Sequence, residues 1–213
     1  MIRVLVLALA WALSGVAGSA EQIPFDETWK EQGFLRLFSN EYTLQGARMG
    51  VVSDGTISVI WRPIDAKLGQ ARTASWNWRV DQSVVATDLT KKGGDDRNLA
   101  IYFVFVDAET AQKLTRKTAR KLLRSPSTRG LVYIWGGAQT RGTAHPSPYN
   151  DALSVKILRG VGTGSFSETI DLAADFQRAF GQAPEVLVGV AITADSDDTD
   201  GRIAAEISNF QIK

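Results

Sequence analysis

The sequence contains no cysteine, a single histidine and only six prolines among its 213 residues. Without cysteine the chain can form no disulfide and none of the usual structural zinc sites, and one histidine excludes a zinc site that needs two or three. An excess of one charge sign is also missing, since 24 Lys and Arg accompany 23 Asp and Glu. This balance excludes a strongly basic, nucleic-acid-binding protein.

The N-terminus carries an apolar run that is too short to span a membrane. Arg3 precedes unbroken apolar residues at positions 4–13, and small residues follow as far as Ala20. A transmembrane helix needs roughly 20 apolar residues, whereas one positive charge, a short apolar run and a small-residue end are typical of a secretory signal peptide. We therefore expect cleavage before Glu21, a single domain over residues 21–213, no transmembrane segment, and a periplasmic or secreted location.

Period-two alternation dominates the rest of the sequence and predicts β-strands. Within residues 76–79 the two tryptophans share one strand face, and Asn77 and Arg79 share the other. Residues 99–106 are almost wholly apolar, as in a strand that is buried on both faces. The pattern predicts a mainly β fold, an antiparallel β-sandwich or jelly roll. Further strands are expected at residues 56–61, 75–80, 131–135, 153–158, 166–170, 186–193 and 203–212.

Two segments depart from this alternation and predict two peripheral helices. Asp107 can cap a helix over residues 108–124, whose outer positions carry lysine and arginine. A second helix is expected over residues 172–180, because Gly181 is a usual helix terminator. The basic residues at 113–129 leave open a scaffold function, in which the first helix binds a partner.

Four carboxylates fall within the six residues Asp195–Asp200, which we expect at a hairpin tip. Carboxylates this close repel one another unless solvent or a cation screens them. Calcium accepts six to eight oxygen ligands in irregular geometry, so an acidic loop suits it. Asp195, Asp197 and Asp198 are therefore candidate ligands of a structural calcium ion, and a solvated acidic turn is the alternative interpretation.

Polar and aromatic side chains on two of the strands are candidate ligand-binding groups. Asn77 and Arg79 lie on the polar face of their strand, where they can form hydrogen bonds with a ligand. Tyr133 and Trp135 precede two glycines near a strand end, where their rings could stack on a sugar or instead fill the core. These four residues predict a carbohydrate-binding surface.

Asp95 and Asp96 form a second acidic segment, just before the apolar strand. They could bind a ligand hydroxyl or a cation, or belong to a hairpin connection whose ion pairs contribute little energy. A glycan hydrolase or lyase needs two carboxylates that face one cleft, and adjacent strand residues point to opposite faces. Catalysis would therefore need an acidic partner from the Asp195–Asp200 hairpin, and no strand–turn–helix nucleophile motif is present as an alternative.

An ordered series of motifs runs through the chain: Trp76–Val80, Asp88, Gly94–Asp96, Ile101–Phe105, Tyr133–Trp135, Pro148–Tyr149, Asp171–Asp175, Ala179–Gly181, Pro184 and Gly189–Thr199. Together these motifs resemble the exported bacterial family called domain of unknown function 3047. The resemblance covers residues 25–213 and implies an exported β-sandwich similar to galactose-binding-like jelly rolls, which commonly bind sugars and often hold a structural calcium ion. The chain departs from the family pattern at Asp198, where asparagine is usual, and in its basic helix.

The sequence thus predicts an exported, non-catalytic β-sandwich that binds a carbohydrate or another cell-envelope polymer. A glycan-active hydrolase or lyase with paired carboxylates is one alternative, and a scaffold that binds a partner through the basic helix is the other. The ligand and the oligomeric state stay open.

Overall fold

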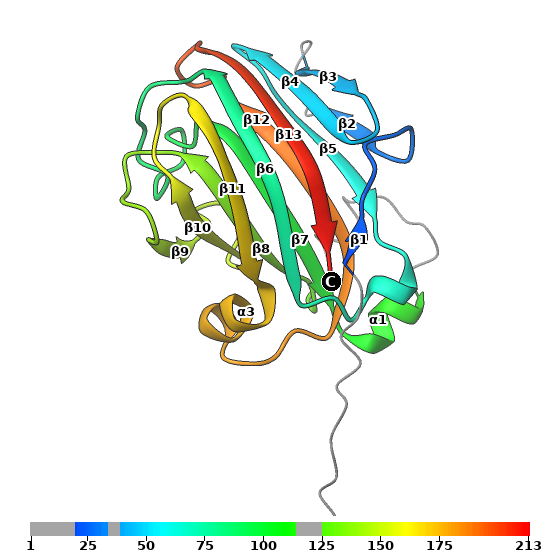
Figure 1. Ribbon diagram of the computed structural model, residues 1–213. Coiled ribbons are helices and arrows are strands. Elements are labelled where there is room, and N and C mark those ends of the chain that lie inside the picture. The colour runs from blue at the N-terminus through cyan, green and yellow to red at the C-terminus, as the bar shows by residue number, and fades with distance from the viewer. Residues whose placement is uncertain (1–19, 34–38, 114–124) are drawn as a thin grey trace, which may run out of the picture.

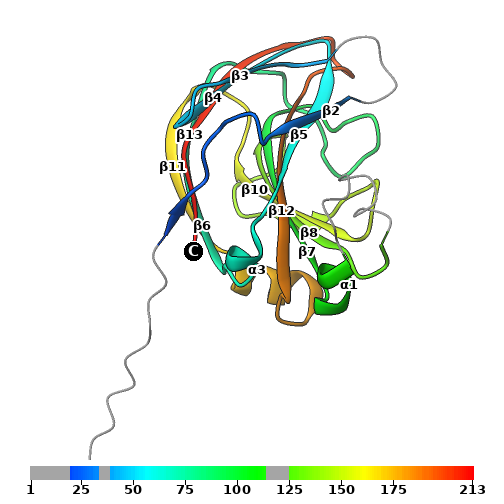
Figure 2. The same ribbon diagram turned by 90° about the vertical axis from the view of Figure 1, so that its right-hand side faces the viewer.

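A computed structural model describes residues 20–33, 39–113 and 125–213, which form two β-sheets packed face to face (Figures 1 and 2). The first sheet has the order β11 (Gly164–Asp171), β6 (Thr73–Gln82), β13 (Arg202–Ile212), β4 (Arg48–Asp54) and β3 (Glu41–Leu44), with β1 (Glu21–Gln22) paired to β13. The second sheet has the order β2 (Lys30–Gly33), β5 (Ile57–Pro63), β12 (Val186–Asp195), β7 (Arg97–Val106), β8 (Arg129–Gly136), β10 (Leu153–Arg159) and β9 (Ala144–Pro146). The predicted β-sandwich is confirmed.

One strand pair is an exception to the antiparallel arrangement, because β10 runs parallel to β8. The connection between them contains β9, which pairs antiparallel with β10 at the sheet edge. Parallel neighbours need a connection long enough to return the chain to its starting end. The segment from Gly137 to Ala152 is that connection. Its length alone does not predict which strand pairs with β10.

In the described residues two α-helices lie at one end of the sandwich, in segments where the sequence predicts peripheral helices (Figure 1). In α1 (Ala108–Lys113), Asp107 Oδ1 accepts a hydrogen bond from the N–H of Thr110 at 2.5 Å. The remainder of that predicted helix, residues 114–124, and residues 1–19 of the expected signal peptide lie outside the described residues. None of the helices in the described ranges has the length and hydropathy that crossing a membrane requires. A short 3₁₀ helix, Ala66–Leu68, precedes β6.

The second helix, α3 (Leu172–Phe180), has both of its ends fixed by local chemistry. Asp171 accepts a hydrogen bond from the N–H of Ala174 at 2.9 Å, which satisfies one unpaired donor of the first turn. Gly181 follows with φ 72°, a left-handed conformation that glycine adopts without steric cost. The buried residues Leu172 and Phe176 fasten the helix to the end of the core.

Large aromatic rings fill the space between the two sheets. The ring centroids of Trp76 and Trp78 of β6 lie 5.5 Å apart, and the ring centroid of Trp135 of β8 lies 5.4 Å from that of Trp78. Tyr133 is 6.0 Å from Trp76, and all four rings are at most 1% exposed. Each buried ring removes roughly 150–250 Å² of surface from water, so this cluster is a main source of the stability of the sandwich.

The second sheet is apolar on both faces, which explains the continuous apolar run of β7. Its inward face contributes Phe103 and Phe105 to the core between the sheets. Its outward face carries a separate apolar cluster, to which Tyr102 adds a partly buried ring. The buried members of the outer cluster are Leu89, Ala100, Val132, Ile134, Val155 and Ile157. The outer face of this sheet is therefore where an apolar ligand surface can be sought.

Candidate functional site

A groove of about 560 Å³ runs over the outer face of the second sheet. Its floor consists mostly of aliphatic side chains from five neighbouring strands, and carboxylates stand at one end. The floor residues include Ile57, Val59, Trp61, Tyr102, Val104, Val132, Ile134, Leu153, Val155 and Ala191. The end of the groove is formed by Asp95, Arg97, Asp195, Asp197 and Asp198.

Strand register places two aromatic rings in one row across this floor. Trp61 of β5 and Tyr102 of β7 are both cross-strand partners of Ala191, on the strand between them. Neighbouring strands are about 4.8 Å apart, so the backbone positions of Trp61 and Tyr102 are roughly 10 Å from each other, with a small side chain in between. Gly189 lies beside the Trp61 ring, and a Cβ at this glycine would be 3.5 Å from it, in ordinary van der Waals contact. The row continues onto Val132 and Val155.

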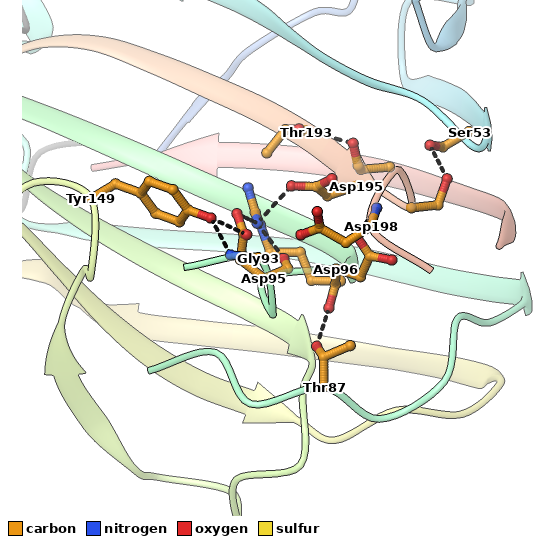
Figure 3. A network of polar contacts seen from close by, with 12 residues as sticks. Ser53, Thr87, Gly93, Asp95, Asp96, Tyr149, Thr193, Asp195 and Asp198 are labelled. Carbon is orange, nitrogen blue, oxygen red and sulfur yellow. Dashed lines mark hydrogen bonds and ion pairs between the residues drawn. The ribbon is translucent and has the colours of Figure 1, made fainter. Parts of the chain in front are cut away.

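The carboxylates reach the groove from two segments that are far apart in the sequence (Figure 3). Asp95 lies just before β7, and Asp195 ends β12, where it is the cross-strand partner of Arg97. The Arg97 guanidinium joins the two segments: Nη1 lies 3.0 Å from Asp195 Oδ2 and 3.3 Å from Asp95 Oδ2. Its Nη2 donates to the Tyr102 hydroxyl at 3.1 Å, which connects the acidic end to the floor.

The carboxylates outnumber the positive charge that is available to them. Burial raises the pKa of Asp195 to about 8; Arg97 opposes this rise, and Asp197 and Asp95 add to it. The pKa of Asp198 is also raised, first by burial and then by neighbouring carboxylates. Asp195 Oδ1 is buried and has no hydrogen-bond donor within the described ranges. This end of the groove is therefore short of positive charge, and a proton or a cation from outside would stabilise it.

Tyr149 closes one side of the acidic end. Its hydroxyl donates to Asp95 Oδ1 at 2.5 Å and accepts from the N–H of Gly93 at 2.8 Å. Burial and the bond to Asp95 raise the pKa of Tyr149 to about 12, so the hydroxyl remains a donor at neutral pH. The ring is 53% exposed and is therefore accessible to a ligand.

Asp96 lies beside the acidic end of the groove, outside the residues that line it, and holds the acidic turn in place. Its side chain is fully buried; Oδ1 accepts from the N–H of Asp198 at 3.2 Å, and Oδ2 accepts from the N–H of Thr199 at 2.8 Å. Of the expected metal ligands, Asp197 and Asp198 group with Asp96, their carboxylate oxygens all within 4.8 Å of one another. Asp195 pairs with Arg97 instead. Asp96 therefore positions the turn, and the expectation that it also binds a ligand hydroxyl or a cation stays a prediction.

The prediction that Tyr133 and Trp135 could stack on a sugar is wrong. Both side chains belong to the core, with exposures of 0% and 1%, so neither presents a ring face to solvent. The Tyr133 hydroxyl donates to Asp175 Oδ2 at 2.9 Å. Because β8 is apolar on both faces, alternation alone did not identify the outward one, which carries Val132 and Ile134.

Asn77 and Arg79 lie on the polar outer face of the first sheet, as their alternation predicts. Asn77 Oδ1 accepts from the Ser167 hydroxyl at 2.7 Å. Arg79 forms two ion pairs at the surface: its Nε lies 3.2 Å from Asp81 Oδ2, and its Nη2 lies 3.9 Å from Glu206 Oε2. The groove is on the opposite side of the sandwich, so the structure does not bring these two residues together with the carboxylates.

Sequence reasoning missed Trp61, Tyr102 and Arg97, the residues that connect the floor of the groove with its acidic end. Arg97 directly follows Asp95 and Asp96, and this charge adjacency was the one local signal available. Trp61 and Tyr102 carry no such signal, because their shared row depends on the pairing of β5, β12 and β7. Tyr149 belonged to a recognisable motif, but its contact with Asp95 spans 54 residues.

Comparison with known proteins gives a family and distant fold similarities. The family described as "Protein of unknown function (DUF3047)" matches residues 27–211, in agreement with the resemblance seen in the motifs. No curated protein matches the chain.

Similar solved structures include a xyloglucanase domain and a xylanase, both with low sequence identity. The xyloglucanase domain of NopAA, a type three effector from Sinorhizobium fredii, is 9% identical, with 92% of this chain and 98% of that chain covered and a TM-score of 0.48. The family 11 xylanase from Neocallimastix patriciarum is 12% identical, with 93% and 97% covered and a TM-score of 0.48. No functional argument follows from likenesses at this level.

Proposed function

We propose that this chain, which belongs to the DUF3047 family, binds a carbohydrate chain in the groove of the second sheet. One observation carries the proposal: the groove combines a row of aromatic and aliphatic side chains with a carboxylate-rich end. The expected signal peptide would deliver the groove to the periplasm or the cell exterior, where envelope polymers are found. The ligand would then be a segment of such a polymer.

The chemistry of the groove suits the two surfaces of a sugar. The C–H faces of pyranose rings stack on aromatic side chains, and Trp61 and Tyr102 offer such rings. The strands that carry them are two strand spacings apart, roughly 10 Å, which is close to the repeat of a disaccharide in an extended glycan. Ionised carboxylates only accept hydrogen bonds, so Asp95 and Asp198 suit the hydroxyl groups of a sugar, which can donate.

A glycan array with the mature chain, followed by calorimetry on the best ligand, tests this proposal. Trp61→Ala should weaken binding by about tenfold, since a stacked ring contributes roughly 0.5–1.5 kcal/mol beyond its buried area. Arg79→Ala, on the other sheet, is the matched control and should change affinity by less than about twofold. Absence of binding to every envelope glycan would refute the proposal. Loss of binding in Arg79→Ala with retention in Trp61→Ala would move the site to the first sheet.

A second candidate function is glycan cleavage, because carboxylates from two segments meet at one groove. Asp95 Oδ2 and Asp195 Oδ2 lie 3.3 and 3.0 Å from the same Arg97 nitrogen, so they are within about 6.3 Å of each other. Glycosidases hold their two carboxyl groups roughly 5–10 Å apart. The Asp195 side chain is only 1% exposed, which favours binding over catalysis. Release of reducing ends from a bound glycan, abolished in Asp195→Asn, would establish cleavage; no release would leave binding as the function.

A further inference from the structure

Three carboxylates at the end of the groove are arranged as cation ligands. Asp96, Asp197 and Asp198 each offer one oxygen, and these oxygens lie within 4.8 Å of one another. Oxygens bound to calcium lie about 2.3–2.6 Å from the ion, so two ligands on opposite sides of it are about 5 Å apart. An ion at the centre of the three oxygens would lie at most about 2.8 Å from each of them, close to the calcium–oxygen distance.

The turn that carries two of these carboxylates is already fixed by the third. Asp96 accepts hydrogen bonds from the N–H of Asp198 at 3.2 Å, and from the N–H and the hydroxyl of Thr199 at 2.8 and 2.5 Å. Oδ1 accepts a single one of these bonds, so it keeps a lone pair for an ion. Because protein donors hold the turn, the site would be formed before an ion arrives.

A separate observation also points to a missing positive charge. Asp195 is 1% exposed, and its Oδ1 has no hydrogen-bond donor anywhere in the described part of the chain. Arg97 is the only cationic side chain among the described residues that line the groove, and its Nη1 already contacts both Asp95 and Asp195. A buried carboxylate oxygen without a donor is costly unless a positive charge compensates it.

We propose that Asp96, Asp197 and Asp198 bind a divalent cation at the end of the groove, with calcium preferred. Two of the ligands come from a turn and the third from a strand end, an irregular set that suits calcium better than the strict octahedron of magnesium. The site does not rest on the proposed carbohydrate function, since ion binding is measured with no glycan present. Failure of one proposal is therefore distinguishable from failure of the other.

Calorimetric titration of the chelator-treated mature chain with calcium tests the site, and thermal melting provides a second readout. A cation that binds only the folded state must raise the melting temperature by mass action. Asp198→Asn, a substitution at an exposed position that should not prevent folding, should weaken calcium binding by more than tenfold. Asp200→Asn removes the same charge from the same turn but lies outside the three carboxylates, so it should change affinity by less than twofold.

Several results would overturn the assignment. One is the absence of both heat and a melting shift at millimolar calcium in the unsubstituted chain. Another is an equal loss in Asp198→Asn and Asp200→Asn, which would indicate general attraction to an acidic turn. Equal affinity for magnesium would contradict the calcium preference. Binding of glucosamine that depends on Asp198, with calcium inactive, would assign the positive charge to an amino sugar instead.

Discussion

The contacts of Asp96 allow a quantitative test of how the acidic turn is held. Asp96→Asn keeps the size of the side chain but replaces one acceptor oxygen with an NH₂ donor. The Oδ2 atom accepts from the N–H of Thr199 at 2.8 Å and from its hydroxyl at 2.5 Å. If the amide nitrogen takes this position, it cannot accept from the N–H of Thr199, and the Thr199 hydroxyl must rotate and become an acceptor to keep a bond. If the amide flips, the bond from the N–H of Asp198 is lost instead.

The size of the effect follows from burial and charge. A hydrogen bond to a charged group contributes about 1.5–3 kcal/mol when its loss leaves a buried partner unsatisfied. Thr199 and Asp198 are exposed, so water can replace part of what they lose. The fully buried Asp96 side chain cannot be reached by water in the same way. We therefore expect Asp96→Asn to lower the free energy of unfolding by about 3 kcal/mol.

Urea unfolding followed by tryptophan fluorescence measures this loss, with chelator present so that no bound cation contributes. Asp54→Asn is the matched control: its side chain is 66% exposed and pairs with Arg202 at 2.6 Å. Exposed ion pairs contribute about 0–1 kcal/mol, so the control should lose little. A loss below about 0.5 kcal/mol in Asp96→Asn would refute the assignment of Asp96 as the residue that holds the turn.

Three further predictions concern the helix α3 and its contacts. Tyr133→Phe removes a hydroxyl that donates to Asp175 at 2.9 Å and should cost about 1.5 kcal/mol in urea unfolding; an unchanged midpoint would contradict this. Gly181→Ala should lower the free energy of unfolding by about 1–2 kcal/mol in the same assay, because alanine is unfavourable at the left-handed φ of 72°. A Cβ there meets no atom within 4 Å, so no steric clash adds to this loss. Equal stability would contradict the left-handed conformation at the end of the helix. Burial alone would raise the pKa of Asp175, but hydrogen bonds from Lys156, Arg178 and Tyr133 together lower it below the ordinary 3.8. Its contribution to stability is therefore present above about pH 4 and is lost as the pH falls further, so Asp175→Asn should show a shallower acid decline in stability; a parallel decline would be inconsistent with the shift.

The strands and helices were largely predictable because their signals are local. In β6 the alternation of residues 76–79 specified which side chains face inward, since one face is apolar and the other polar. The second helix was predictable from Gly181, whose left-handed conformation ends it. In β8 the same alternation failed, because Tyr133 and Val132 lie on opposite faces that are both apolar. A period of two separates the faces but does not say which one meets the other sheet.

The amino-acid sequence by itself determined the β-rich class, the apolar strand at residues 99–106 and the two acidic segments that supply the candidate site. Only the tertiary structure decided that these segments meet, because the pairing of β12 with β7 makes Asp195 and Arg97 cross-strand partners. The pairing of β12 with both β5 and β7 places Trp61 and Tyr102 in one row. In the folded chain Asp96, rather than Asp195, groups with Asp197 and Asp198. Periodicity and turn chemistry act over a few residues and can be predicted from a local stretch of sequence. Strand register joins residues that are about a hundred positions apart, and neither segment by itself indicates which residues of the other it will face.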